Sequence, residues 1–335
     1  MYPLKFEHIY VDKVWGGRNL STFRTDLPKG DIGESWELVC RSGAVSKVAN
    51  GEYSGLGLNE LIRMKKEALV GHKISIEQFP LLVKFLDARI KLSIQVHPDD
   101  NYAAEKENDL GKMEAWVVLE AAENANMILG FKDCSKNEFL EAIEDGSLED
   151  YLNVVPVNKG DVFFIPSGLI HSMEGVVVAE IQQNSDTTYR VYDYNRGREL
   201  HVDKAVEVVD FSLEAKKIKG IWKEKEGYKK IYYCYNPYFS LEQYEIKTFC
   251  TEKSNPDRFY IFTCIEGSGK IVYEEKSEEI IKGDTVLIPA CLGEYTLEGP
   301  MSLLKSYVPD IEALESEILD GIKHIPKDRK KDSFV

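Results

Sequence analysis

The sequence lacks any long apolar run, although it has 335 residues of which 43% are hydrophobic. A membrane-spanning helix needs about 18 or more consecutive apolar residues, and no stretch of the chain has them. We therefore expect no membrane crossing. The first residues also lack a basic start followed by an apolar run. A secretory signal is not expected, and a cytoplasmic location is predicted.

Cysteine is scarce and is not arranged for chemistry. The six cysteines are scattered, without a Cys-x-x-Cys pair, and several stand inside apolar runs that resemble strands. This usage favours reduced and mostly buried thiols over disulfides or a thiolate metal site.

The chain also has fewer positively charged than negatively charged residues. The chain has 42 Lys and Arg against 57 Asp and Glu, a formal net charge of −15. Nucleic-acid binding is not expected, because such proteins present a basic face. A phosphorylated substrate is disfavoured only weakly, since surface charges are screened beyond about 8 Å at physiological salt and a few basic residues can dominate a pocket.

The most informative segment runs from Gly160 to His171 and reads GDVFFIPSGLIH. It contains a Gly-Asp turn, an apolar strand, a Pro that cannot continue a central ladder, a second Gly and a His. This order predicts the strand of a small β-barrel that presents one metal ligand.

Two segments upstream supply further candidate ligands. Gln95 and His97 are two residues apart, as are Lys112 and Glu114, and side chains two apart on a strand share a face. Gln95, His97, Glu114 and His171 therefore form a candidate divalent metal site. Imidazole and carboxylate ligands suit Zn²⁺, and iron or manganese stays open.

These motifs resemble a known family. The spacing Gly-x5-Pro-x-Gly-x2-His is similar to the second cupin motif, and Gln-x-His with the later Glu resembles the first motif of type I mannose-6-phosphate isomerases. The segments VWGG at 14–17, GESWE at 33–37 and EIQQNSDTTYR at 180–190 resemble the short bacterial form of that family. The resemblance is dense from about residue 4 to about residue 203.

The resemblance and the strand pattern together predict a mainly β fold. We expect two cupin (jelly-roll) barrels, with a small helical insertion in the N-terminal half. A catalytic domain is placed at 1–215, with helical segments near 58–86 and 132–152, although 79–86 could also be a buried strand. Ser135 and Glu138 form a capping-box pattern for the second helical segment.

The second barrel is placed at 220–315, followed by a tail at 316–335. Residues 283–289 repeat the Gly-x5-Pro phrase of residues 160–166, but no His follows them. This barrel is therefore expected to lack metal ligands.

Candidate catalytic residues surround the predicted metal site. Lys112 shares the inward face with Glu114, and Glu180 lies in an apolar strand where an unpaired buried carboxylate would be costly. The planar fork of Arg190 suits a sugar hydroxyl, an enediolate oxygen or a phosphate. Its alternative is an internal ion pair with Asp186 or Glu180.

The resemblance implies a zinc-dependent aldose–ketose isomerase with one zinc ion per chain. Its substrate would be a small sugar phosphate, interconverted between mannose 6-phosphate and fructose 6-phosphate through a cis-enediol. It implies that Arg190 lies near the reacting carbons and that Lys112, Glu180 and Asp186 transfer or position protons, and the base stays open. A cupin Fe(II) oxygenase and a sugar-binding cupin without activity are the alternatives.

Overall fold

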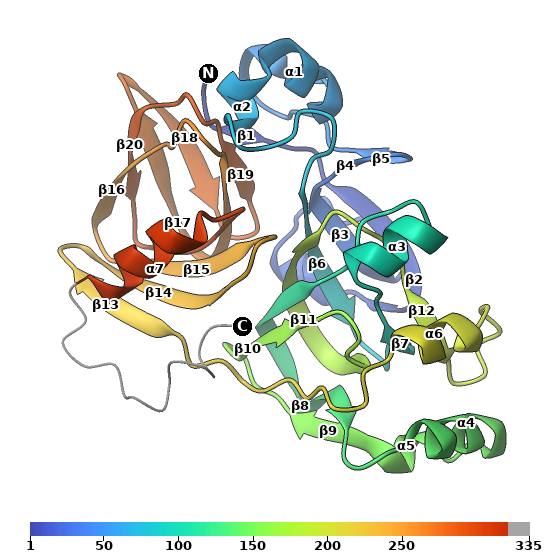
Figure 1. The fold of residues 1–335 in the computed structure, drawn as a ribbon. Helices are drawn as coiled ribbons and strands as arrows, with labels where there is room; N and C mark the ends of the chain where they lie inside the picture. Colours follow the sequence, from blue (N-terminus) through green and yellow to red (C-terminus); the bar gives the residue numbers. More distant parts are fainter. Residues whose placement is uncertain (321–335) are drawn as a thin grey trace. The chain divides into compact units, whose positions relative to one another are not determined.

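The computed structural model describes residues 1–320 of the chain, and strands make up most of its regular structure (Figure 1). The mainly β class predicted from the sequence is therefore confirmed. No helix in this described part is long and apolar enough to cross a membrane. All six cysteines are unpaired, and four of them are buried.

The chain forms two compact units, each assembled from segments that are distant in the sequence. One unit contains Met1–Ile9, Trp36–Val83 and the described residues from Ile218 onward, and the other contains Tyr10–Ser35 and Lys84–Lys217. Both units use residues of the N-terminal half. They therefore do not match the domains placed at 1–215 and 220–315 one to one, and that division stays a prediction.

A nine-stranded sheet carries the predicted site residues. Its strand order is β10-β8-β11-β6-β3-β2, with β9 paired to β8, and with β7 paired to β11 and β12. The strands are β2 (Ile9–Gly17), β3 (Ile32–Leu38), β6 (Leu81–Ala88), β7 (Ile94–Val96), β8 (Glu114–Phe131), β9 (Leu152–Pro156), β10 (Val162–Ile165), β11 (His171–Gln183) and β12 (Tyr189–Tyr192). Every residue of β6 is buried, because the strand lies between β11 and β3. The sequence left residues 79–86 open between a helix and a buried strand, and the structure decides for the buried strand β6.

Strands β8 and β11 pair antiparallel along most of the length of β11. Their register shifts on both sides of Val176 and Val177, and such bulges bend a strand and increase its twist. Gly175, at the first shift, has a φ of 72°, which a residue without Cβ adopts at little cost. The pairing places Gln182 opposite Glu114, while the start of β11 places His171 opposite Gln95 of β7.

A ten-stranded sheet holds the repeated phrase at 283–289. Its order is β1-β19-β17-β21-β15-β14-β13, with β18 and β20 paired to β17, and with β16 paired to β20. The strands are β1 (Leu4–Lys5), β13 (Ile221–Lys225), β14 (Tyr228–Tyr235), β15 (Ser240–Ile246), β16 (Phe249–Lys253), β17 (Tyr260–Tyr273), β18 (Lys276–Ile281), β19 (Thr285–Ile288), β20 (Glu294–Glu298) and β21 (Met301–Tyr307). Strands β4 (Cys40–Arg41) and β5 (Ala44–Val45) form a separate pair. The two-barrel description stays a prediction.

Short helices connect the strands. They are α1 (Leu58–Lys65), α2 (Glu67–Val70), α3 (Asp100–Lys106), α4 (Lys136–Asp145), α5 (Leu148–Tyr151), α6 (Val202–Val208) and α7 (Ile311–Leu319), with 3-10 turns η1 (Asn19–Thr22) and η2 (Gly51–Tyr53). The predicted capping box is present, because Ser135 Oγ accepts from Glu138 N and Glu138 Oε2 accepts from Ser135 N. Helices α4 and α5 therefore form the predicted helical insertion.

Two predicted boundaries need correction. The helical segment expected near 58–86 contains only α1 and α2, since residues 81–88 are strand β6. Residues 316–319, assigned to the tail, belong to α7, where Leu314 and Ile318 are buried. Residues 321–335 of the predicted tail lie outside the described residues.

Candidate metal centre and active site

Three side chains from separate strands converge on one point. His97 follows β7, Glu114 begins β8 and His171 begins β11. The Nε2 atoms of the two histidines are 3.1 Å apart. Glu114 Oε1 lies 3.6 Å from His97 Nε2 and 3.4 Å from His171 Nε2. All three residues are buried. The sequence therefore identified residues that the fold does bring together.

The fourth predicted ligand lies beside this group. Gln95 Nε2 is 3.4 Å from His171 Nε2, and its Oε1 accepts a hydrogen bond from Ser93 Oγ at 3.2 Å. An amide binds a metal through its oxygen, and a rotation of the Gln95 amide exchanges the positions of the two atoms. Gln95 is thus within reach of the same point.

Backbone carbonyls fix the orientation of both imidazole rings. His97 Nδ1 lies 3.0 Å from the carbonyl oxygen of Thr187, and His171 Nδ1 lies 2.9 Å from that of Leu169. A carbonyl only accepts, so each Nδ1 carries the proton and each neutral ring directs an unprotonated Nε2 at the common point. Burial, together with the positive charge of Lys112, lowers the pKa of His97 to about 3, and burial also lowers the pKa of His171.

The carboxylate of Glu114 completes a set of electron-pair donors. Burial alone would raise its pKa, but the positive charge of Lys112 holds that pKa well below its ordinary value. Both carboxylate oxygens are buried without a hydrogen-bond partner among the described residues. Three electron-pair donors that face one another repel, and a bound cation removes that repulsion. The residues therefore fit a divalent metal ion, and the nitrogen and oxygen donors suit zinc.

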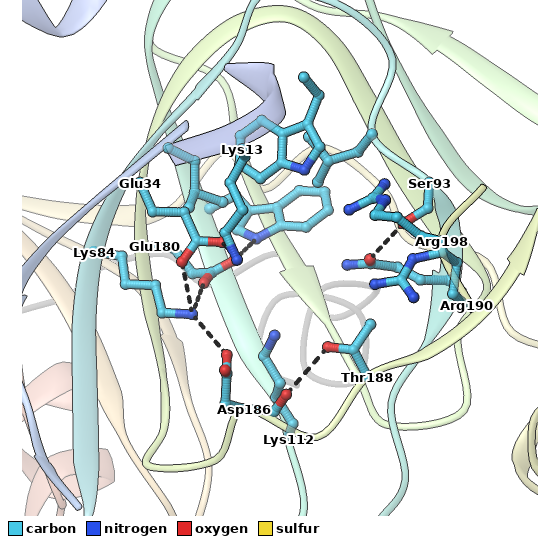
Figure 2. Close-up of a pocket in the computed structure, with 15 residues that line it drawn as sticks. Lys13, Glu34, Lys84, Ser93, Lys112, Glu180, Asp186, Thr188, Arg190 and Arg198 are labelled. Atoms are coloured by element: carbon cyan, nitrogen blue, oxygen red, sulfur yellow. Dashed lines mark hydrogen bonds and ion pairs between the residues drawn. The ribbon is translucent and has the colours of Figure 1, made fainter. Parts of the chain in front are cut away.

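A cavity of about 200 Å³ lies next to this group. It is lined by Lys13, Trp15, Glu34, Lys84, Leu86, Leu92, Ser93, Gln95, Lys112, Trp116, Glu180, Asp186, Thr188, Arg190 and Arg198. Figure 2 shows Lys13, Glu34, Lys84 and Glu180 gathered on one side, with Arg190 and Arg198 on the other. All four predicted catalytic residues line this cavity. Their roles stay a prediction.

Glu180 is buried and held by two partners. Trp116 Nε1 donates to Oε2 at 2.9 Å, and Lys84 Nζ lies 3.7 Å from Oε1. Burial, followed by the negative charge of Glu114, raises the pKa of Glu180 to about 7, against the opposing charges of Lys112 and Lys84. The partner expected for a buried carboxylate is thus present, and the carboxyl can change protonation state near neutral pH.

Lys112 and Asp186 differ in their exposure to solvent. Lys112 is buried, and its Nζ lies 3.4 Å from Glu114 Oε2, so it faces inward together with that residue. The Asp186 side chain is 47% exposed and lies 3.5 Å from Lys84 Nζ. Asp186 is therefore the more exposed of the two residues in the lining of the cavity.

Arg190 forms neither of the ion pairs considered as its alternative. Its Nη1 donates to the carbonyl oxygen of Glu199 at 2.7 Å, and among the described residues no carboxylate of Asp186 or Glu180 pairs with it. Burial, and then the charge of Arg198, lowers the pKa of Arg190. The guanidinium thus keeps donors available to a ligand in the cavity.

Lys84 is the functional candidate that the sequence analysis missed. It lies in the buried strand β6, with Nζ 3.7 Å from Glu34 Oε2 in addition to its contacts with Glu180 and Asp186. Burial would lower its pKa, but these carboxylates raise it above its ordinary value. A lysine inside the otherwise apolar run PLLVKFL was the available signal.

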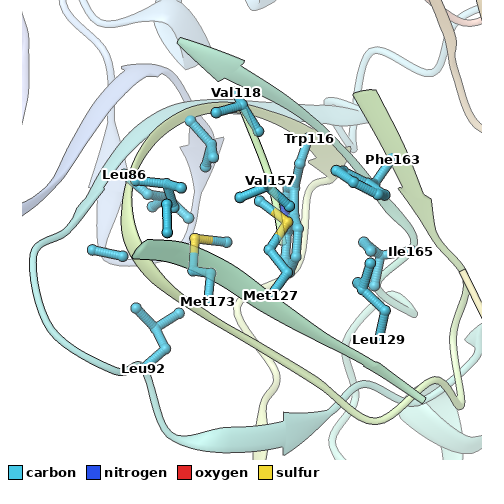
Figure 3. Packing of buried hydrophobic residues seen from close by; sticks show 14 of the residues in the cluster. Leu86, Leu92, Trp116, Val118, Met127, Leu129, Val157, Phe163, Ile165 and Met173 are labelled. Atoms are coloured by element: carbon cyan, nitrogen blue, oxygen red, sulfur yellow. The ribbon is translucent and has the colours of Figure 1, made fainter. Parts of the chain in front are cut away.

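An apolar cluster supports the cavity wall. Figure 3 shows Leu86, Leu92 and Trp116 packed among the side chains of this cluster. The Trp116 ring also contacts the edge of His171, with ring centroids 5.4 Å apart. One tryptophan therefore packs in the core, orients a metal-ligand candidate and donates to Glu180.

Comparisons with known proteins decide the family. Residues 4–125 match the model of the phosphomannose isomerase type I catalytic domain, and residues 229–308 match that of the mannose-6-phosphate isomerase cupin domain. The chain is 35% identical to the mannose-6-phosphate isomerase ManA of Bacillus subtilis over 314 residues, which covers 91% of this chain and 99% of the relative. The chain belongs to the type I mannose-6-phosphate isomerase family. Members of this family are aldose–ketose isomerases.

Further members of the family agree in sequence and fold. The mannose-6-phosphate isomerase of Streptococcus mutans is 33% identical over 313 residues, covering 91% of this chain and 98% of the relative. The crystal structure of the mannose 6-phosphate isomerase from Bacillus subtilis has a TM-score of 0.86 at 35% identity, covering 91% of this chain and 99% of that one. The cupin-like fold implied by the resemblance is therefore confirmed.

Proposed function

We propose that this chain interconverts mannose 6-phosphate and fructose 6-phosphate with the help of one zinc ion. The observation that carries the proposal is the convergence of three unprotonated donor atoms, from His97, Glu114 and His171, beside a buried carboxyl with a pKa of about 7. Membership of an isomerase family supports the same reaction.

Gln95, His97, Glu114 and His171 would hold the zinc ion. When bound, such an ion stabilises the negative charge that develops on the sugar oxygens as the carbon-bound proton leaves. The chain fixes the direction of its donors before any ligand arrives, because both Nδ1 atoms are bonded to backbone carbonyls. Lys112 contributes a positive charge behind the carboxylate of Glu114.

Glu180 is the proposed proton carrier. In the forward direction it removes the proton from C2 of the aldose, a C1–C2 double bond forms, and a cis-enediol results. The same carboxyl then returns a proton to C1, which leaves the ketose carbonyl at C2. A group with a pKa near 7 performs both steps well at neutral pH. Asp186 and Lys112 line the same cavity and are the candidates for moving the hydroxyl proton.

The two guanidinium groups complete the site. Arg190 is proposed to stabilise the charge that appears on the enediolate, because a fixed positive donor there requires no reorganisation during the reaction. Arg198 lines the same side of the cavity and carries the charge that a phosphate group needs. The cavity thus combines proton transfer at one side with anion binding at the other.

The test is a coupled measurement of fructose 6-phosphate formation from mannose 6-phosphate. Activity should disappear after treatment with a chelator and return when zinc is added. His97→Ala should lose bound zinc, because affinity depends on completed coordination. His72→Ala is the control, since His72 is exposed and lies outside the motifs.

Two results would contradict the proposal. Full zinc content in both His97→Ala and His171→Ala would refute the ligand assignment. Oxygen consumption with bound iron, or sugar binding without turnover, would replace the isomerase by one of the two alternative cupin functions.

A further inference from the structure

The segment between β11 and β12 carries two groups that the proposed site depends on, the Asp186 side chain and the Thr187 carbonyl. Residues 184–188 form no strand, so ladder hydrogen bonds do not hold them. Yet Asp186 lines the cavity, and the carbonyl oxygen of Thr187 accepts from His97 Nδ1 at 3.0 Å. Other contacts must fix this segment.

Asp109 supplies such contacts from a distant part of the chain. Its Oδ2 accepts from Ser185 Oγ at 3.2 Å and from Thr187 Oγ1 at 3.1 Å. Its Oδ1 accepts from Leu110 N at 2.9 Å. The carboxylate is therefore bonded to both residues that flank Asp186.

The position of Asp109 is itself defined by the turn that follows α3. Its backbone N donates to the carbonyl oxygen of Ala103 at 3.3 Å, and Asn108 before it has a φ of 52°. A non-glycine residue in this left-handed region is uncommon and is favoured for asparagine. The turn thus presents the carboxylate in a fixed direction.

We propose that Asp109 is a positioning residue for the metal centre, acting through Thr187 on His97. It accepts a hydrogen bond from the Thr187 hydroxyl and so fixes the residue whose carbonyl sets the tautomer and direction of the His97 ring. By the same contacts it fixes the two neighbours of Asp186. This inference rests on the proposed function, because it assigns a task to a residue behind a proposed zinc ligand.

A carboxylate suits this position because Leu110 N and the two hydroxyls all donate to it. An ionised carboxylate only accepts, whereas an amide replaces one oxygen by a donating NH₂ group. In Asp109→Asn the amide oxygen can still accept from Leu110 N, but the NH₂ group then faces the two hydroxyls, which would have to turn from donors into acceptors. The substitution preserves shape and replaces one of the two acceptor oxygens by a donor, which makes it a test of the contacts with Ser185 and Thr187.

The experiment measures the zinc dissociation constant by competition with a chromophoric chelator, which does not depend on turnover. We expect Asp109→Asn to weaken zinc binding by about tenfold, the lower end of the range for loss of an outer partner of a metal ligand. Thr187→Val should do the same, since it removes the hydroxyl and keeps the carbonyl. Thr187→Ser keeps both groups and should restore wild-type affinity.

Asp100→Asn is the matched control. Asp100 also tethers the end of β11, since its Oδ1 accepts from Gln183 Nε2 at 2.9 Å, and it accepts from Gly111 N at 2.8 Å. Neither of these contacts involves Thr187. Substitution of Asp100 by Asn is expected to change zinc affinity less than about twofold, because no outer partner of a ligand is lost. Circular dichroism and thermal unfolding of the metal-free variants report on folding.

The double variant Asp109→Asn with Thr187→Val shows whether Asp109 acts on zinc binding through Thr187 or whether the two residues affect zinc binding independently. If the two residues act in sequence, the double variant should bind zinc no more weakly than either single variant. Equal affinities of Asp109→Asn and Asp100→Asn, or full affinity in Thr187→Val, would overturn the inference. If Asp109→Asn does not fold, the comparison of Thr187→Val with Thr187→Ser decides. Failure of the wild-type chain to bind zinc would instead refute the proposed function.

Discussion

Replacing Lys84 by Met should shift the pH dependence of activity, because this lysine neutralises the carboxylates on one side of the cavity. Lys84 is buried, with only 3% of its side chain exposed, and lies within 4.0 Å of Glu34, Glu180 and Asp186. Methionine has a similar length and no charge. The substitution therefore removes the ammonium group while largely preserving the packing of β6.

The size of the effect follows from the distance between Lys84 Nζ and Glu180 Oε1. At 3.7 Å and an effective dielectric constant of about 20, the attraction amounts to about 4 kcal/mol. Since 1.36 kcal/mol corresponds to one pKa unit, this bounds the rise in the pKa of Glu180 at about three units. The charge of Lys112, which also acts on Glu180, remains in the variant, so we expect a rise of about one unit or more.

The direction of the change is fixed by the role of Glu180. The proposed base acts in its deprotonated form, so activity falls as the pH drops through its pKa. In the wild-type chain burial and Glu114 raise that pKa to about 7, and loss of Lys84 raises it further. The acidic limb of kcat/KM should therefore move to higher pH, while the basic limb stays in place.

The assay is the pH profile of kcat/KM with mannose 6-phosphate, with zinc content and circular dichroism as controls. Lys13→Met is the matched control, because Lys13 lines the same cavity but pairs with Glu34 at 2.9 Å rather than with Glu180. An unshifted acidic limb in a folded, zinc-loaded Lys84→Met would refute the reasoning. It would mean that Glu180 is not the base or that Lys84 does not set its pKa.

Two further predictions concern other charged side chains. Arg190→Lys and Arg190→Ala should lower kcat and kcat/KM together by about 10²- to 10³-fold, with KM nearly unchanged. If steady-state kinetics instead show a preserved kcat and a large rise in KM, Arg190 binds the phosphate in the ground state. In the ten-stranded sheet, Lys305 Nζ lies 3.1 Å from Glu252 Oε2. Lys305→Met should lower the free energy of unfolding in urea by about 3–5 kcal/mol at neutral pH. The wild-type pKa of Glu252 is lowered, because Lys305 and Lys230 outweigh its burial. The pair therefore stabilises the fold above the ordinary pKa of 4.5, and this stabilisation is lost as the pH falls through the lowered pKa. The variant should instead become more stable as the pH falls, because its buried Glu252 carboxylate is then neutralised.

The pairing of neighbouring ligand candidates could be predicted because their spacing is local, whereas the convergence of the three segments rested on the expected barrel. Side chains two residues apart share a face of a strand, and this rule applies to Gln95 and His97 whatever the rest of the fold does. The helix of the insertion was predictable for the same reason, since Ser135 and Glu138 are three residues apart. Local patterns survive into the structure when their partners are near in sequence.

Longer-range contacts left no such pattern. Asp109 meets Thr187 across 78 positions, and nothing in either segment indicates the other. Residues 79–86 stayed ambiguous because a short apolar run suits a buried strand and a buried helix equally. Pairing with β11 and β3 decides in favour of the strand, and this also places Lys84 beside Glu180.

The charge of the cavity explains how an acidic chain can accept an anionic substrate. The chain has a formal net charge of −15. The lining of the cavity holds five basic side chains and three acidic ones, a formal balance of +2. Because exposed charges are screened beyond about 8 Å at physiological salt, a phosphate inside the cavity interacts chiefly with this local excess. A carboxyl at Glu180 with a pKa of about 7 is part of the same balance, since each proton it takes up makes the cavity more positive. In the proposed mechanism, anion binding and proton transfer are therefore coupled through one set of side chains.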